Sequence, residues 1–134
     1  MTVDAEQLEK DLTAYFAVVL NLTADAGIYR GQIPETVDNG VAVRITGQMT
    51  TSSIDHPAFT VQVLGKFSSR ENAWGMLTKL AGSLPQYGVS TANFRLVYIL
   101  PDGGINAPFA HDERGVVKQY ASYNMRVAVL TREA

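Results

Sequence analysis

Two stretches in the first half of the chain alternate apolar and polar side chains with a period of two. The pattern covers residues 41–46 and 59–64. Its apolar positions are Val41, Val43, Ile45, Phe59, Val61 and Val63. Successive side chains of a β-strand point to opposite faces of the sheet, so this alternation predicts two strands that are each buried on one face. The chain must therefore provide other elements that cover that face.

The first of these elements is a predicted helix of about 18 residues at the start of the chain. Asp4 is in place to cap it, and Gln7 three residues later is the other half of a capping box. Apolar residues then recur at steps of three and four, and Gly27 is the expected terminator. The predicted stripe is Leu8, Leu12, Tyr15, Phe16, Val19 and Leu22.

A second helix is predicted between the capping box Ser68–Glu71 and Pro85, which cannot continue a helix. Its inner stripe would consist of Ala73, Met76, Leu77, Leu80, Ala81 and Leu84. Two amphipathic helices are enough to cover one face of a small sheet. They can leave the other face open to water or to a partner.

Two further strands are predicted in the C-terminal part of the chain. Residues 94–101 are almost continuously apolar, which favours a strand covered on both faces, and residues 120–130 form a long last strand. The stretch between them, "DGGINAPFAHDERG", is rich in turn residues and is predicted to be a loop. Residues 28–33, closed by Pro34, also fit a short extra strand.

Together these elements predict an α+β fold for a single domain over residues 1–134. We expect a mainly antiparallel sheet of about four strands with both helices packed on one face, in the order α-β-β-α-β-β. A length of 134 residues and a hydrophobic content of 46% are sufficient for one sizeable core.

Composition argues against several classes of function. The net charge is −2, so no overall basic field favours nucleic acid. The chain has no cysteine, which removes disulfides, thiolate metal sites and cysteine nucleophiles. The longest apolar run, near residues 14–22, is shorter than the roughly 20 residues needed to cross a bilayer. We therefore expect neither a membrane partner nor sequence-specific binding of nucleic acid.

The tripeptide Asp38-Asn39-Gly40 has the composition of a tight turn. A phosphate cradle would need a glycine-rich loop that leads into a helix, whereas this loop leads into a strand. The sequence therefore predicts a corner of the sheet, with Gly40 at a positive φ angle.

No residue pattern indicates catalysis. Neither His56 nor His111 has a second histidine at the spacing of metal motifs, and no G-x-S-x-G element is present. A metal role for His111 beside Asp112 and Glu113, or an enzyme site assembled only in space, stays a minor alternative. We expect a protein that is not an enzyme, with no catalytic residues, no cofactor and no metal.

One face of the predicted sheet is neither fully polar nor fully apolar. Strand parity directs Arg44, Gln62, Arg95, Asn124 and Arg126 away from the helices, mixed with Leu64, Val97, Ile99, Ala128 and Leu130. Such a face can simply meet water. The sharper hypothesis is a subunit interface, because arginine among aliphatic residues is common at interfaces.

The interface hypothesis names four residues: Arg44, Gln62, Arg95 and Arg126. Residues 1–38 contain seven acids and two bases. The acidic first helix is therefore a candidate for the electrostatic complement of this face in a neighbouring copy.

Three stretches carry a family resemblance: "GIYRGQIPETVDNGVAVRITGQ", "PAFTVQVLGKFSSRENAWGMLTKL" and "YASYNMRVAVL". Over residues 1–131 the chain resembles the minor capsid and tail-terminator proteins of long-tailed bacteriophages. Those proteins share an N-terminal helix, a D-N-x-V-x-V segment, an F-x-V-x-V strand, a second helix and a final strand with aromatic residues and arginine. One departure is Val37, where a proline is common in the family.

The resemblance implies a structural virion protein of a phage or prophage, located in the virion tail and in the host cytoplasm during assembly. It implies a ring, expected to be a hexamer, that ends tail-tube polymerisation and joins tail to head. Its expected partners are further copies of itself, the tail-tube protein, and a head-completion or connector protein. The alternative that the residues leave open is a small ligand-binding or regulatory α+β domain.

Overall fold

The computed structural model describes residues 3–23, 26–49 and 56–130. Within these ranges the chain forms two helices and six strands. Their order is α1 (Ala5–Leu20), β1 (Ile28–Arg30), β2 (Gly40–Gln48), β3 (Ala58–Phe67), α2 (Arg70–Ser83), β4 (Gln86–Ser90), β5 (Arg95–Glu113) and β6 (Val116–Leu130).

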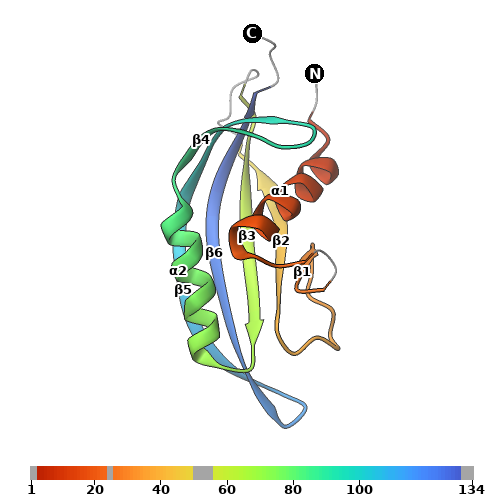
Figure 1. Ribbon diagram of the computed structural model, residues 1–134, viewed down its shortest axis with the longest axis vertical. Helices are drawn as coiled ribbons and strands as arrows, with labels where there is room; N and C mark the ends of the chain where they lie inside the picture. The colour runs from red at the N-terminus through yellow and green to blue at the C-terminus, as the bar shows by residue number, and fades with distance from the viewer. Residues whose placement is uncertain (1–2, 24–25, 50–55, 131–134) are drawn as a thin grey trace.

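The strands form one curled sheet in the order β1-β2-β3-β6-β5-β4 (Figure 1). β1 runs parallel to β2, and all other neighbours are antiparallel. The predicted sheet of four strands is therefore wrong, because the sheet has six strands and is mixed. The two strands beyond these four, β1 and β4, are short edge strands. β1 lies within residues 28–33, where the sequence fits a short extra strand, whereas the mostly exposed β4 has no apolar alternation that could identify it.

Both helices pack on one face of this sheet, with α1 over β1 and β2 and α2 over β3, β5 and β6 (Figure 1). The core lies between helices and sheet. From the helices it takes Leu8, Leu12, Phe16, Leu20, Ala73, Met76, Leu77 and Leu80. Of the predicted stripes, Tyr15, Val19, Leu22 and Leu84 are only half-buried at its margin, and Ala81 is exposed.

The helix ends differ in detail from the predicted ones. Asp4 caps α1 as expected, since its Oδ1 accepts a hydrogen bond of 3.2 Å from the backbone N–H of Gln7. The helix ends at Asn21 rather than Gly27, because Asn21 takes the left-handed conformation at φ 55°. The cap of α2 is Ser69, whose hydroxyl accepts from the N–H of Asn72 at 3.1 Å.

The expected loop at residues 102–115 is also wrong, because these residues extend β5 and enter a long hairpin with β6. Its turn residues serve the hairpin in two ways. Gly103 and Gly104 lie at one break in the β5–β6 register and Pro108 lies at another. Arg114 and Gly115 form the two-residue turn with positive φ angles of 55° and 80°.

A further register shift, between Leu96 and Tyr98, changes which face the apolar residues of β5 occupy. Leu96 and Ile99 both enter the core under the helices, although they are three residues apart. The expectation that Ile99 faces away from the helices is therefore wrong, because simple parity does not survive a bulge. Residues 94–101 are also not covered on both faces, since Val97, Tyr98 and Leu100 are only half-buried.

Gly40 opens β2 at the predicted corner, but it does not have a positive φ angle. A Cβ atom there would lie 2.9 Å from Cγ1 of Val37 and 3.3 Å from the ring of Tyr29. Glycine is thus required by close packing rather than by backbone conformation. The adjacent Asn39 side chain accepts hydrogen bonds from both the N–H and the hydroxyl of Ser68.

Candidate assembly surfaces

The sheet face opposite the helices carries a polar row that crosses three neighbouring strands. Arg44 on β2 pairs with Gln62 on β3, and Gln62 pairs with Asn124 on β6. The Nε of Arg44 donates to Oε1 of Gln62 at 2.9 Å. The structure therefore brings two of the four proposed interface residues into contact on the outer face.

Arg126 lies in the next row of the same face, across from Thr60 on β3 and Leu100 on β5. Its guanidinium carbon is 5.6 Å from the centre of the Tyr98 ring, a cation–π contact. Its Nε–H is buried and has no hydrogen-bond partner among the described residues. Arg95 on β5 is exposed and pairs with Leu130, which lies four residues beyond Arg126 on β6.

These three arginines have no ionic partner in the part of the chain that the structure describes. The ion pairs there join Arg30 to Glu6, Lys66 to Glu113, Arg114 to Glu35 and Lys118 to Asp38. Arg44, Arg95 and Arg126 thus present positive charge among half-buried aliphatic residues. This is a surface that an acidic or hydrogen-bond-accepting partner would complement.

The acids of residues 1–38 are mostly used inside the molecule. Asp4 caps α1, Glu6 pairs with Arg30, and Oε2 of Glu9 accepts from the N–H of Ile45 at 2.9 Å. Glu35 and Asp38 pair with the β5–β6 hairpin. Asp25 lies outside the described residues. The acidic excess therefore serves mainly to hold the N-terminal segments onto the sheet.

Asp11 is the most heavily bonded of these acids. It is 5% exposed, and its carboxylate accepts hydrogen bonds from Gln7, Thr91 and Asn93 at 2.7–2.9 Å. Burial alone would raise the pKa of Asp11, but the hydrogen bonds from Asn93, Gln7 and Thr91 outweigh burial and lower it. The carboxylate ties α1 to the turn between β4 and β5, which Figure 1 shows crossing the start of the helix.

A second polar cluster joins the β5–β6 hairpin to β3. Nζ of the buried Lys66 lies 2.7 Å from Oε1 of Glu113, and the hydroxyl of Tyr120 donates to the other carboxylate oxygen. Hydrogen bonds from Lys66 and then Tyr120 lower the pKa of Glu113. Burial, followed by the bond to Glu113, raises the pKa of Tyr120 to about 12.

The distal part of the hairpin, residues 109–117, is here called the hairpin tip. Three of its apolar side chains are more than half exposed: Phe109 (59%), Val116 (53%) and Val117 (54%). Phe109 stacks on Tyr120 with ring centres 5.9 Å apart, and His111 approaches the same ring edge-on. The sequence reading missed this apolar surface because Phe109 stands alone in a stretch of turn residues.

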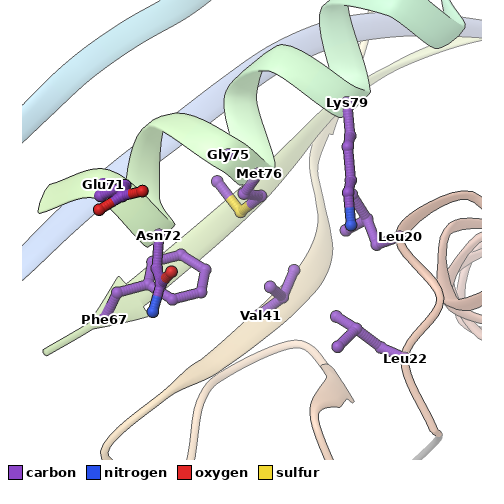
Figure 2. Close-up of a pocket in the computed structure, with 9 residues that line it drawn as sticks. All are labelled: Leu20, Leu22, Val41, Phe67, Glu71, Asn72, Gly75, Met76 and Lys79. Atoms are coloured by element: carbon purple, nitrogen blue, oxygen red, sulfur yellow. The ribbon is translucent and has the colours of Figure 1, made fainter. Parts of the chain in front are cut away.

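A concave site lies between the two helices and is here called the helix groove (Figure 2). Its volume is about 390 Å³. Apolar side chains line most of it, namely Leu20, Leu22, Val41, Phe67 and Met76. Glu71, Asn72 and Lys79 on α2 supply its polar groups. The groove is left open at Gly75, where an added Cβ atom would meet nothing within 4 Å.

The two histidines of the sequence belong to different parts of the fold. His56 is exposed just before β3, and His111 belongs to the hairpin tip. Within the described ranges, no group of three or more His, Cys, Asp or Glu side chains is arranged to hold a metal ion. Neither described helix is long and apolar enough to cross a membrane.

A comparison with solved structures finds this architecture in a virion. The similar chain belongs to a structure described as the virion of a native gene transfer agent (GTA) particle. The TM-score is 0.55 at 11% identity, and the alignment covers 96% of this chain and 99% of that one. The two chains therefore share a fold over almost their full lengths. Neither a protein-family model nor a curated protein matches the sequence.

Proposed function

We propose that this chain is a structural virion protein of a long-tailed phage or prophage. In this role it forms a ring, proposed to be a hexamer, that ends polymerisation of the tail tube and joins the tail to the head. The observation that carries the proposal is the full-length fold likeness to a chain of a gene transfer agent virion. The sequence resemblance to tail-terminator proteins supports the same role independently.

Three surfaces of the molecule suit such assembly. The outer sheet face carries arginines without ionic partners among the described residues, the hairpin tip carries exposed apolar side chains, and the helix groove is concave and largely apolar. A protein that works through contacts needs surfaces of this kind and needs no cofactor or catalytic group. The proposed partners are further copies of the chain, the tail-tube protein and a head-completion or connector protein.

The direct test uses the purified chain and the tail-tube protein encoded in the same genome. We expect ring-shaped particles by electron microscopy, either free or at the tube ends. Tubes polymerised with the chain should be shorter and should carry a cap that tubes formed alone lack. A chain that stays monomeric and does not alter tube length or tube ends would exclude this role.

The proposed interface on the outer sheet face has its own test. Changing Arg44, Arg95 and Arg126 together to Glu should dissociate the oligomer, because positive charge at the contact becomes negative. The same three positions changed to Lys keep the charge and form the matched control. Sedimentation velocity measures the result, and circular dichroism confirms that both variants are folded. An unchanged sedimentation coefficient in the Glu variant would remove this face from the interface.

The helix groove gives a specific reason to consider a second role, a small ligand-binding or regulatory domain. Its volume of about 390 Å³ falls within the range of small-molecule sites. In that case a panel of small apolar and amphipathic molecules should raise the melting temperature, and Gly75→Leu, which fills the groove, should abolish the effect. A panel without any effect leaves only the structural role.

A further inference from the structure

The hairpin tip carries exposed apolar side chains, and the helix groove is a largely apolar hollow on a different part of the molecule. The tip extends past the start of α2, where Nη1 of Arg70 bonds the carbonyl oxygen of Pro108 at 2.8 Å. Beyond this point Figure 1 shows the hairpin without a helix over it. Phe109, Val116 and Val117 are therefore exposed because the helix layer ends before it reaches them.

The groove has the opposite character, since it is a hollow in the helix layer. Figure 2 shows Val41 and Met76 facing into the space between α1 and α2, with Leu20 and Leu22 on the far side. The described residues leave this space open at Gly75, where an added Cβ atom would meet nothing within 4 Å. An apolar side chain that entered would bury surface on both partners, at roughly 25 cal/mol per Å² of apolar area.

One pair of charges on the two surfaces is complementary. Asp112 on the tip pairs across the hairpin with Val117, is exposed, and forms no ion pair with a described residue. Lys79 is exposed on the groove wall, and its side chain extends along the cavity in Figure 2, again without an ion pair to a described residue. A tip seated in the groove would place the carboxylate of Asp112 close to the ammonium group of Lys79.

We propose that the hairpin tip of one copy docks in the helix groove of a second copy, with Val117 in the groove and Asp112, its cross-strand neighbour on the same face of the hairpin, beside Lys79. This inference rests on the proposed self-assembly and names the surfaces that perform it. Because tip and groove are different surfaces, the contact is heterologous: each copy offers one tip and one groove. Such contacts repeat from copy to copy and close into a ring when the rotation allows it.

Disulfide trapping tests the contact directly, because the chain has no cysteine of its own. One preparation carries Val117→Cys and a second carries Gly75→Cys. When the two are mixed and oxidised, any bond between positions 117 and 75 must join different copies. We expect a covalent dimer from the mixture and only background from either variant alone. A mixture of Val117→Cys with Tyr87→Cys, exposed on the edge strand β4, is the matched control.

Two results would overturn the docking model. The first is a 117–75 yield no higher than that of the 117–87 control. The second is efficient bonding of Val117→Cys to itself, which would indicate that two tips pair symmetrically. The mixture is assayed free and on tail tubes, so a chain that assembles only on the tube is also covered.

Charge exchange tests the pairing without cysteine. Asp112→Lys and Lys79→Asp should each weaken assembly by about fivefold or less, and the double variant should recover most of the loss. The range follows from about 0.2–1 kcal/mol for an exposed ion pair and about 1.4 kcal/mol per tenfold. Sedimentation equilibrium gives the association constants. If the double variant is as weak as the two single losses combined, the two groups do not meet.

These experiments separate failure of the docking model from failure of the proposed function. Rings that form normally while positions 117 and 75 never cross-link would disprove the tip-in-groove contact and leave the virion role intact. A chain that neither self-associates nor caps tail tubes would contradict both. Val117→Asp should abolish ring formation in a folded chain, whereas Val18→Asp, at an 82% exposed valine on α1, should not.

Discussion

The two faces of the sheet use alternate residues of the same strands for different purposes. On β3, Phe59, Val61 and Val63 face the helices and are at most 3% exposed. Thr60 and Gln62 between them face the opposite way and are half-buried. The helix-covered face is closed by this chain except at the helix groove. The outer face is only partly closed, and the alternation therefore separates residues that fold the domain from residues available to a partner.

The energies of the two faces differ accordingly. A fully buried apolar side chain contributes about 1.5–3 kcal/mol relative to an exposed one. An exposed polar pair such as Arg44 with Gln62 contributes about 1 kcal/mol or less. Substitutions on the helix-covered face should thus be felt in stability. Substitutions on the outer face should be felt in assembly.

The largest effect should come from Phe16→Ala on α1. Phe16 is fully buried in the core, so its truncation leaves a cavity and should lower the free energy of unfolding by about 3–5 kcal/mol. Arg44→Ala on the outer face is the comparison variant and should change it by about 0.5 kcal/mol or less. Urea unfolding measures both. A similar loss in the two variants would contradict the division between the faces.

Much of this division could be read from the sequence. The stripe of α1 and the alternation of β2 and β3 identified Leu8, Leu12, Phe16 and the core valines. Period and polarity sufficed there because each element has one wet side and one dry side. The row of Arg44, Gln62 and Asn124 was also placed on the correct face, since no bulge interrupts that part of the register.

The differences between the predicted and the observed sheet have two physical causes. A short edge strand such as β4 is held by its hydrogen bonds to the neighbouring strand β5 and has no apolar alternation of its own. Its sequence therefore resembles that of a loop. The β5–β6 hairpin contains Gly103, Gly104 and Pro108, which normally end strands but here sit at breaks in the register. A single sequence does not show where a strand has a bulge. Both the extension of β5 into the hairpin tip and the position of Ile99 in the core depend on such bulges.

Asp11 was a missed signal of a different kind. Position 11 falls between Leu8 and Leu12 on the apolar stripe, and an acid at such a position indicates a buried bond. Asp11→Ala removes the acceptor shared by Thr91 and Asn93 and should cost about 1.5–3 kcal/mol. Gln7→Ala removes only one donor to this carboxylate and should cost about 1 kcal/mol or less. Thermal unfolding would show whether the buried carboxylate matters more than its partner.

A pH titration compares the polar clusters of the two faces. The pKa values of Asp11 and Glu113 are lowered in the folded state, so both groups stabilise the fold above their ordinary values of 3.8 and 4.5. That stability is lost as the pH falls through their folded values. The free energy of unfolding should therefore fall less steeply at acid pH in Asp11→Asn, which removes the carboxylate on α1. The same is expected of Glu113→Gln, which removes the carboxylate of the hairpin. If both variants lose stability at acid pH as steeply as the unaltered chain, these carboxylates are not the cause of that loss.

The loss of stability at alkaline pH depends on the β5–β6 hairpin. The pKa of Tyr120 is raised to about 12, so its contribution is complete below pH 10 and is lost as the pH rises from 10 towards 12. Tyr120→Phe should make unfolding less sensitive to pH in that window. It should not remove all sensitivity, because burial also raises the pKa of Tyr15 and Tyr123. Urea midpoints at pH 9 and 11 give the comparison.

The smallest effect, and the one opposite in sign, is expected at Gly75 in the helix groove. Glycine inside a helix costs roughly 0.5–1 kcal/mol relative to alanine, and a methyl group here meets no atom within 4 Å. Gly75→Ala should therefore raise the free energy of unfolding by about 0.5–1 kcal/mol. Gly65→Ala on the same side of the sheet should lower it, because its Cβ atom would lie 2.5 Å from the Phe67 ring and 2.7 Å from the sulfur of Met76.

The two glycines separate a filled part of the helix-covered face from an open one. A side chain at Gly65 would clash with its neighbours, whereas a side chain at Gly75 would enter the open helix groove. A stabilised Gly75→Ala chain that assembles less well would mean that the methyl group occupies space needed by a partner. A stabilised chain that assembles normally would mean that the groove is only a packing defect, and assembly would then depend on the outer face alone. Unfolding and sedimentation of the same variant decide between these outcomes.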